Sequence, residues 1–255
     1  MIAQGFANAG ANVLLTSRDE NACRQAAESL DKKTNAPNSK IEFVASNVGT
    51  RDGCHDLANH VREVFDGRLD VLVNNAGTSW GEDMMRESGK ANWGWDKVLD
   101  LNVKGMFYLT RECIPLLERS QPSDDGEPAD PGRIINIGSI AGIVPQGAPT
   151  HAYDTSKAAV HHLTKKLAGD LASKNITVNA IAPGYVPSRM SMGLQAYGAN
   201  AETMSKSIPL GRMGNADDMA GAAIYLSSRA SSWTTGAILN VDGGACTIQM
   251  PLSNL

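Results

Sequence analysis

Short apolar runs alternate with amphipathic stretches along most of the chain. The runs are rich in valine, isoleucine and leucine and show little polar alternation. This pattern is typical of strands that are buried on both faces of a parallel sheet. It predicts six strands, at residues 13–16, 41–44, 69–73, 133–137, 176–181 and 237–241.

The stretches between these runs carry helical periodicity. They predict helices at residues 1–10, 19–30, 51–65, 96–117, 153–171 and 215–227. Strands that alternate with helices predict an α/β fold, in which helices cover both faces of a parallel sheet. We therefore expect one domain over residues 1–255, a three-layer, doubly wound parallel sheet. Ligands of such sheets bind at the carboxyl ends of the strands.

Composition and charge argue against two classes of partner. The net charge of −4 gives no electrostatic basis for binding nucleic acid or an anionic membrane. No apolar stretch approaches the length of a membrane span, and the amino-terminal residues lack the charged region of a signal peptide. The four cysteines are scattered, as expected for free thiols in a reducing compartment, so we expect a cytoplasmic protein. His161 and His162 are adjacent on a helix and point apart, which argues against a metal site.

Three polar side chains are predicted to meet after the strand at residues 133–137. Ser139 follows that strand, whereas Tyr153 and Lys157 lie one turn apart on the next helix. A nearby ammonium stabilises a phenolate, so we expect Lys157 to lower the pKa of Tyr153 from about 10 toward neutral pH. The Ser139 hydroxyl can orient a carbonyl oxygen toward the Tyr153 proton. Alternatively, the Tyr-x-x-x-Lys spacing is an ordinary feature of an exposed helix.

Two further motifs accompany this group along the chain. Asn74-Asn75-Ala76-Gly77 closes the strand at residues 69–73, and Leu101-Asn102-Val103 lies in the following helix. Together with Ser139 and the Tyr-x-x-x-Lys pair, these motifs resemble those of the short-chain dehydrogenase/reductase family over nearly the whole chain. Within that family, residues 74–81, 135–139 and 187–190 are most similar to 3-oxoacyl-acyl-carrier-protein reductases of the rhamnolipid-biosynthesis type.

The resemblance implies a Rossmann-like fold, a reaction and the roles of four residues. Tyr153 donates a proton to a carbonyl oxygen that Ser139 orients. Lys157 lowers the pKa of Tyr153 and binds the nicotinamide ribose, and Asn102 supports a water relay. The implied activity is the NADP(H)-dependent interconversion of a ketone and a secondary alcohol, with a 3-oxoacyl thioester as a candidate substrate. The implied assembly is a homodimer or homotetramer.

The expected cofactor is NADP(H) because of the residues that follow the strand at residues 13–16. NAD-using relatives have an acidic residue there, which binds the ribose hydroxyls. In this chain Ser17 and Arg18 occupy the place, and a hydroxyl with a guanidinium suits a 2′-phosphate. Alternatively, Arg18 is a solvated loop charge. The resemblance implies further cofactor contacts at Asn47, Val48, Asn74, Ala76, Gly77, Tyr153, Lys157, Pro183, Gly184, Val186 and Ser188.

The chain departs from the family at its amino-terminal end. In the family, a first strand and a Thr-Gly-x-x-x-Gly-x-Gly turn precede the helix that lies here at residues 1–10. That turn directs backbone N–H groups at the pyrophosphate of the cofactor. Without it we expect six strands instead of seven and weak NADPH binding. A second hypothesis is therefore a catalytically impaired fragment or a non-catalytic binding subunit of the same family.

The loop expected at residues 78–95 is rich in tryptophan and methionine and has two interpretations. Its apolar side chains could line a substrate cleft, or they could pack the loop onto the domain as a lid.

Overall fold

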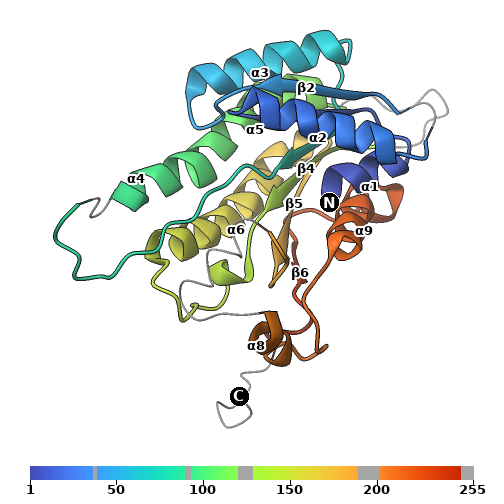
Figure 1. Ribbon diagram of the computed structural model, residues 1–255. Coiled ribbons are helices and arrows are strands. Elements are labelled where there is room, and N and C mark those ends of the chain that lie inside the picture. The colour runs from blue at the N-terminus through green and yellow to red at the C-terminus, as the bar shows by residue number, and fades with distance from the viewer. Residues whose placement is uncertain (37–38, 90–92, 120–128, 189–200, 248–255) are drawn as a thin grey trace.

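The computed structural model describes residues 1–36, 39–89, 93–119, 129–188 and 201–247. Its strands are β1 (Val13–Ser17), β2 (Ile41–Ala45), β3 (Val71–Asn74), β4 (Gly132–Ile137), β5 (Ile176–Pro183) and β6 (Ile238–Val241). Its helices are α1 (Ile2–Asn8), α2 (Glu20–Lys33), α3 (Arg51–Val64), α4 (Trp93–Leu99), α5 (Met106–Leu117), α6 (His151–Leu171), α8 (Ala201–Lys206) and α9 (Ala216–Ser227). The helices lie on both sides of the strands (Figure 1).

The predicted α/β class and the predicted strands are confirmed, with small differences at the strand ends. Every strand pairing is parallel. Asp19 caps the start of α2, because its side chain accepts the N–H of Ala22 at 3.0 Å. Among the described helices, none is long and apolar enough to cross a membrane.

The single helix predicted at residues 96–117 is wrong in detail. Helix α4 begins earlier, at Trp93, and a π-helical segment at Asp100–Gly105 separates it from α5. At Gly105 the helix runs close to the loop between β2 and α3. A Cβ at Gly105 would lie only 2.2 Å from the carbonyl oxygen of Val48 in that loop. Such a tertiary contact leaves no mark on hydrophobic periodicity, so the sequence pattern shows one continuous helix.

The six strands form two sheets within the described part of the chain. β1 pairs with β2, whereas the other four strands pair in the order β3-β4-β5-β6. Both sheets contribute to one hydrophobic core, in which Leu14 of β1 and Leu72 of β3 pack with side chains of α3 and α5. The parallel layer is therefore interrupted between β1 and β3, and no described strand pairs with the edges that they present there.

Burial along the strands reflects this interruption. β4 and β5 are buried along almost their whole length. In contrast, the apolar residues of β1 and β3 are only half-buried. The apolar composition of β1 and β3 is typical of strands in the middle of a sheet. They are partly exposed because each has one edge with no neighbouring strand.

The backbone hydrogen bonds identify the amides that face the interruption. Val13 donates its N–H to Lys40 at 2.8 Å, and alternate residues of a strand face opposite edges. The amides of Leu14 and Thr16 therefore face away from β2. By the same alternation the amides of Val71 and Val73 face away from β4, because the Asp70 carbonyl accepts the N–H of Arg133 at 3.0 Å.

Hydrogen exchange should reveal these unpaired edges. We expect the amides of Leu14, Thr16, Val71 and Val73 to exchange faster than those of Leu15 and Leu72, which face a paired strand. Residue-level exchange followed by NMR measures the difference, and the amides of β5 provide an internal reference. Equal protection of both sets would contradict the interrupted sheet.

Candidate active site

The carboxyl ends of β3, β4 and β5 form the frame of the site. Asn74 of β3 pairs in register with Asn136 of β4, which pairs in turn with Ala180 of β5. The segments that follow these strands therefore leave the sheet at one edge, which is where parallel sheets bind ligands. They carry the predicted site residues Gly77, Ser139 and Gly184.

Ser139 begins a short 3₁₀ turn, η2 (Ile140–Gly142), directly after β4. Its Oγ accepts the N–H of Ala141 at 3.1 Å and caps this turn. The turn lies against the backbone of α6, because a Cβ at Gly142 would be 2.5 Å from the carbonyl carbon of Lys157. Glycine at this position thus lets Ser139 approach the helix that carries Tyr153 and Lys157.

Lys157 is buried with its ammonium at the end of β4. Its Nζ donates a hydrogen bond to the carbonyl oxygen of Ile137 at 2.7 Å. Burial lowers the pKa of Lys157 from 10.5 to about 8, so the ammonium is still largely protonated at neutral pH. The same Nζ lies 5.6 Å from the centroid of the Tyr153 ring. Lysine and tyrosine are therefore neighbours, as their spacing predicts.

The predicted lowering of the Tyr153 pKa is wrong for this structure. Burial raises the pKa of Tyr153 above 10, and the carboxylate of Asp154 raises it further, whereas a hydrogen bond with the Ser139 side chain lowers it. The physical reason is that burial disfavours the phenolate, and this effect outweighs the influence of the Ser139 side chain. Tyr153 therefore carries its proton at neutral pH.

Asn102 lies in the π-helical segment and is buried. Its Oδ1 accepts the N–H of Thr78 at 2.8 Å, and its Nδ2 donates to the Thr78 carbonyl at 3.0 Å. The same Nδ2 donates to Ser156 Oγ at 2.9 Å. Asn102 thus joins the segment after β3 to α6, one residue before Lys157. Its role in a water relay stays a prediction.

Gly77 brings the segment after β3 into the same group. A Cβ at Gly77 would lie 3.3 Å from Asn102 Oδ1 and 3.8 Å from Lys157 Nζ. Ala76 is exposed, whereas Asn74 is buried. The Asn74 amide donates to Thr110 Oγ1 at 3.0 Å and to Asn136 Oδ1 at 2.9 Å. Its side chain therefore ties β3 to α5 and β4, and its contact with a cofactor stays a prediction.

The segment after β5 borders the site on its other side. Pro183 ends β5, and Gly184 packs so closely on Asp242 that a Cβ would lie 2.8 Å from the Asp242 Cα. Val186 is half-buried and Ser188 is exposed. These residues lie at the edge of the sheet where ligands bind. Their contacts with a cofactor stay predictions.

Ser17, Arg18 and Asn47 form a second group at the carboxyl ends of β1 and β2. The Ser17 hydroxyl bonds with the backbone of Asp19, and the Ser17 carbonyl accepts the N–H of Ser46 at 2.9 Å. Arg18 is exposed and makes no hydrogen bond or ion pair with any described residue. Its guanidinium is therefore available to an anionic ligand, as the cofactor prediction requires.

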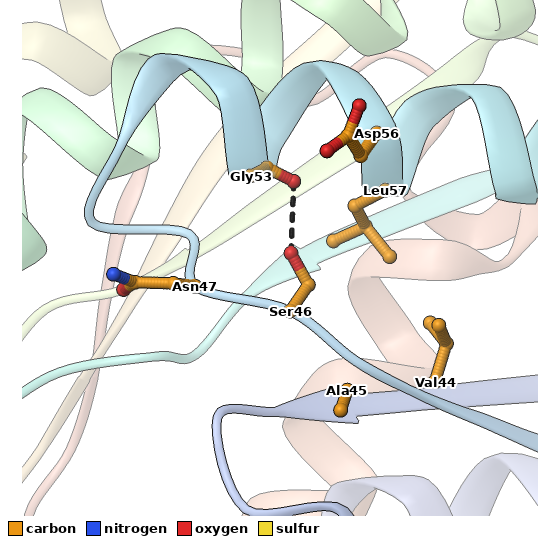
Figure 2. A pocket seen from close by; sticks show the side chains of 7 residues that line it. All are labelled: Val44, Ala45, Ser46, Asn47, Gly53, Asp56 and Leu57. Atoms are coloured by element: carbon orange, nitrogen blue, oxygen red, sulfur yellow. Dashed lines mark hydrogen bonds between the residues drawn. The ribbon is translucent and has the colours of Figure 1, made fainter.

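A pocket of about 240 Å³ lies beside this second group (Figure 2). Within it, Ser46 Oγ donates to the Gly53 carbonyl at 2.8 Å. Asn47 Oδ1 accepts the N–H of Gly49 at 3.2 Å, and Val48 is buried behind it. The pocket includes none of Ser139, Tyr153 and Lys157. Its lining residues are Val44, Ala45, Ser46, Asn47, Gly53, Asp56 and Leu57.

The loop before α4 packs onto that helix at Trp80. The Trp80 and Trp93 rings lie 4.8 Å apart, and the Trp93 ring lies 4.4 Å from Lys97 Nζ. A Cβ at Gly94 would be 2.0 Å from the Trp80 ring, so the indole fills the space that this glycine leaves. These contacts support the packing interpretation for Trp80 and Trp93, whereas Met84 and Met85 are exposed.

Sequence reasoning missed several buried polar residues that position the site. Asn136 Nδ2 donates to Thr164 Oγ1 at 2.9 Å, and Thr164 donates to the Val160 carbonyl at 2.8 Å. With Thr110 and Asn74, these residues form a hydrogen-bonded network from α5 through β3 and β4 to α6. The sequence does hint at this network, because Asn136 is a polar residue inside the apolar strand sequence Ile-Ile-Asn-Ile. A buried polar side chain needs hydrogen-bond partners.

Comparison with known proteins places this geometry in a family. Residues 1–246 match the family described as Enoyl-(Acyl carrier protein) reductase. The chain is 41% identical to the rhamnolipids biosynthesis 3-oxoacyl-[acyl-carrier-protein] reductase of Pseudomonas aeruginosa, over 96% of this chain and 90% of that protein. It is 33% identical to the 3-oxoacyl-[acyl-carrier-protein] reductase FabG of Thermotoga maritima, over 94% of this chain and 89% of that protein.

Solved structures agree with these relatives. The structure described as a Pseudomonas aeruginosa RhlG/NADP active-site complex is 40% identical, with a TM-score of 0.84 over 96% of this chain and 90% of that one. A short-chain type dehydrogenase/reductase from Mycobacterium marinum is 28% identical, with a TM-score of 0.84 over 97% of this chain and 90% of that one. The chain therefore belongs to the short-chain dehydrogenase/reductase family of oxidoreductases, and its Rossmann-like α/β fold is confirmed.

The buried amide of Asn136 should be essential to the frame of the site. In Asn136→Ala the Asn74 amide loses an acceptor and Thr164 Oγ1 loses a donor. We expect the free energy of unfolding to fall by about 1–3 kcal/mol, because buried polar groups lose their partners. The exposed Asn8→Ala is the control, with an expected change within about 0.5 kcal/mol. Urea denaturation compares the two, and equal effects would contradict the role of the network.

Proposed function

We propose that this protein is an NADPH-dependent reductase of ketones and that its substrate class is a 3-oxoacyl thioester. The observation that carries the proposal is the buried ammonium of Lys157, which lies 5.6 Å from the ring centroid of Tyr153 and bonds to the end of the strand that leads to Ser139. Two hydroxyls and one ammonium at the carboxyl edge of a parallel sheet suit the reduction of a carbonyl group. The substrate class comes from the names of the relatives cited above, which are 3-oxoacyl-[acyl-carrier-protein] reductases.

In the proposed reaction the protein orients the ketone and supplies its proton. Ser139 donates a hydrogen bond to the carbonyl oxygen, and Tyr153 transfers its phenolic proton to that oxygen as negative charge develops. NADPH supplies the hydride that the carbonyl carbon accepts. The raised pKa of Tyr153 favours the protonated phenol before reaction, and the nearby Lys157 ammonium stabilises the phenolate that remains. Asn102, through Ser156, fixes the start of α6 while the phenol regains a proton from solvent.

The described residues fit NADPH at two of the places where such a cofactor needs contacts. Arg18 offers an unengaged guanidinium to a 2′-phosphate, next to the end of β2 and Asn47. Gly77 leaves open backbone near Asn102 and Lys157, where the nicotinamide ribose would bind. Val48 follows β2, Ala76 follows β3, and the segment Pro183–Ser188, including Gly184 and Val186, begins at the end of β5, so all of them leave the carboxyl ends of strands where the cofactor would bind.

We further propose that the protein acts in the cytoplasm as a homodimer or homotetramer. Its free cysteines support a reducing compartment. Phe107 on α5 and the fully exposed Trp233 are large apolar side chains that self-association would bury.

A second candidate function is a catalytically impaired or purely binding member of the family. The interruption between β1 and β3 favours it, since no strand and no glycine-rich turn lies there in the described chain. The pyrophosphate of the cofactor would then lack the backbone donors that such a turn provides. This candidate predicts a folded protein that fails to bind NADPH and reduces no ketone.

Replacement of Tyr153 by phenylalanine tests the catalytic assignment. Tyr153→Phe removes the proton donor but keeps the ring, so turnover of a 3-oxoacyl thioester should fall by about 10²–10⁴-fold. Tyr225→Phe, on the exposed side of α9, is the matched control and should keep its activity. NADPH oxidation measures turnover, and circular dichroism confirms folding. A folded Tyr153→Phe protein with full activity would refute the assignment.

Replacement of Arg18 by alanine tests the choice of cofactor. We expect the affinity for NADPH to fall about tenfold or more through loss of one charge-assisted contact, whereas the affinity for NADH should hardly change. Arg24→Ala, a nearby arginine already paired with Glu20, is the control. Fluorescence titration gives both dissociation constants. An unchanged ratio of the two would contradict the assignment, and no binding of either cofactor would support the second candidate.

A further inference from the structure

His161 is a buried titratable residue that the proposed reaction does not use. It lies one turn after Lys157 on α6 and is only 7% exposed. Its neighbour His162 is exposed. The two histidines therefore provide a matched pair, with one side chain inside the domain near the site and one in solvent.

The contacts of His161 are with the turn that carries Ser139. The backbone N–H of Ser139 points at His161 Nε2 over 3.5 Å. The ring packs against Gly138, where a Cβ would lie only 2.2 Å from Nε2. His161 therefore touches Ser139 and the residue before it.

These contacts require a neutral ring with one particular tautomer. An Nε2 that accepts the Ser139 N–H carries no proton, so the proton of the neutral ring resides on Nδ1. Burial and the positive charges of Lys157 and Lys165 lower the pKa of His161 from 6.5 to about 4, while a backbone hydrogen bond with Gly142 opposes this shift. The ring is thus neutral throughout the physiological range.

We propose that neutral His161 is a positioning residue, which fixes Ser139 by accepting its backbone N–H and by packing against Gly138. On the strand side the turn is anchored by the bond from Gly138 N–H to the Ile181 carbonyl at 2.7 Å. His161 anchors it on the helix side, so the Ser139 hydroxyl stays directed at Tyr153. The catalytic consequence rests on the proposed function, whereas the hydrogen bond itself does not.

Two variants separate hydrogen bonding from packing. In His161→Gln the side-chain oxygen can accept the Ser139 N–H, whereas His161→Leu fills space and cannot. We expect kcat to fall about 10–100-fold in His161→Leu, because small misplacements of a catalytic group have effects of that order. KM and the dissociation constant of NADPH should change little, His161→Gln should recover most of kcat, and the control His162→Leu should match the wild type.

NMR of the wild-type protein tests the bond without any variant or activity. In ¹⁵N-labelled protein, His161 should stay neutral with an unprotonated Nε2 from pH 7 down to about 5, because its pKa is lowered to about 4. In His161→Leu the Ser139 amide should exchange with solvent faster than in the wild type.

Each outcome has one meaning. A protonated Nε2, or unchanged Ser139 exchange and kcat in a folded His161→Leu protein, would overturn the proposal. Equal losses in kcat for His161→Leu and His161→Gln would also overturn it, because packing alone would then explain them. A wild-type protein without reductase activity would instead refute the proposed function, and the tautomer measured by NMR would still decide the role of His161.

Discussion

The buried ammonium of Lys157 on the Ile137 carbonyl is the interaction on which the site depends. It joins the end of β4 to the first turns of α6 and sets Tyr153 next to the turn of Ser139. Burying a charge is unfavourable unless it is well bonded, and the lowered pKa of Lys157 expresses that penalty. This unfavourable burial occurs where a cation beside a phenol can take part in catalysis. Charged groups with shifted pKa values are typical of functional sites.

Neutral hydrogen bonds surround this charge and hold its neighbours in place. Asn102 ties the backbone of Thr78 to Ser156 on α6. The network around Asn136 joins both strands to α5 and α6, which pack on the same face of the sheet. The site is therefore rigid where β3, β4 and α6 meet. It is less supported toward β1, where the sheet is interrupted and the cofactor-binding group of Ser17 and Arg18 lies.

The sequence predicts the features that depend on local patterns of residues and misses those that depend on contacts between distant segments. Apolar runs locate the strands, and the spacing of Tyr153 and Lys157 on one helix locates the chemistry, because both patterns repeat with the backbone. The π-helical segment around Asn102, the separation of β1 from β3 and the direction of the Tyr153 pKa depend on contacts between distant segments. Likewise, nothing in the adjacent pair His161-His162 shows which ring faces Ser139, since that depends on the rotation of α6 against β4.

A titration of Lys157 tests the central claim that a desolvated ammonium organises the site. In protein labelled with ¹³C at the lysine Cε, the resonance of Lys157 can be assigned by its loss in Lys157→Met and followed by NMR as the pH rises. The account predicts a midpoint near the value of about 8 that burial imposes, well below the titration of the exposed lysines. A midpoint near the usual value of about 10.4 would show a solvated ammonium and would contradict the account.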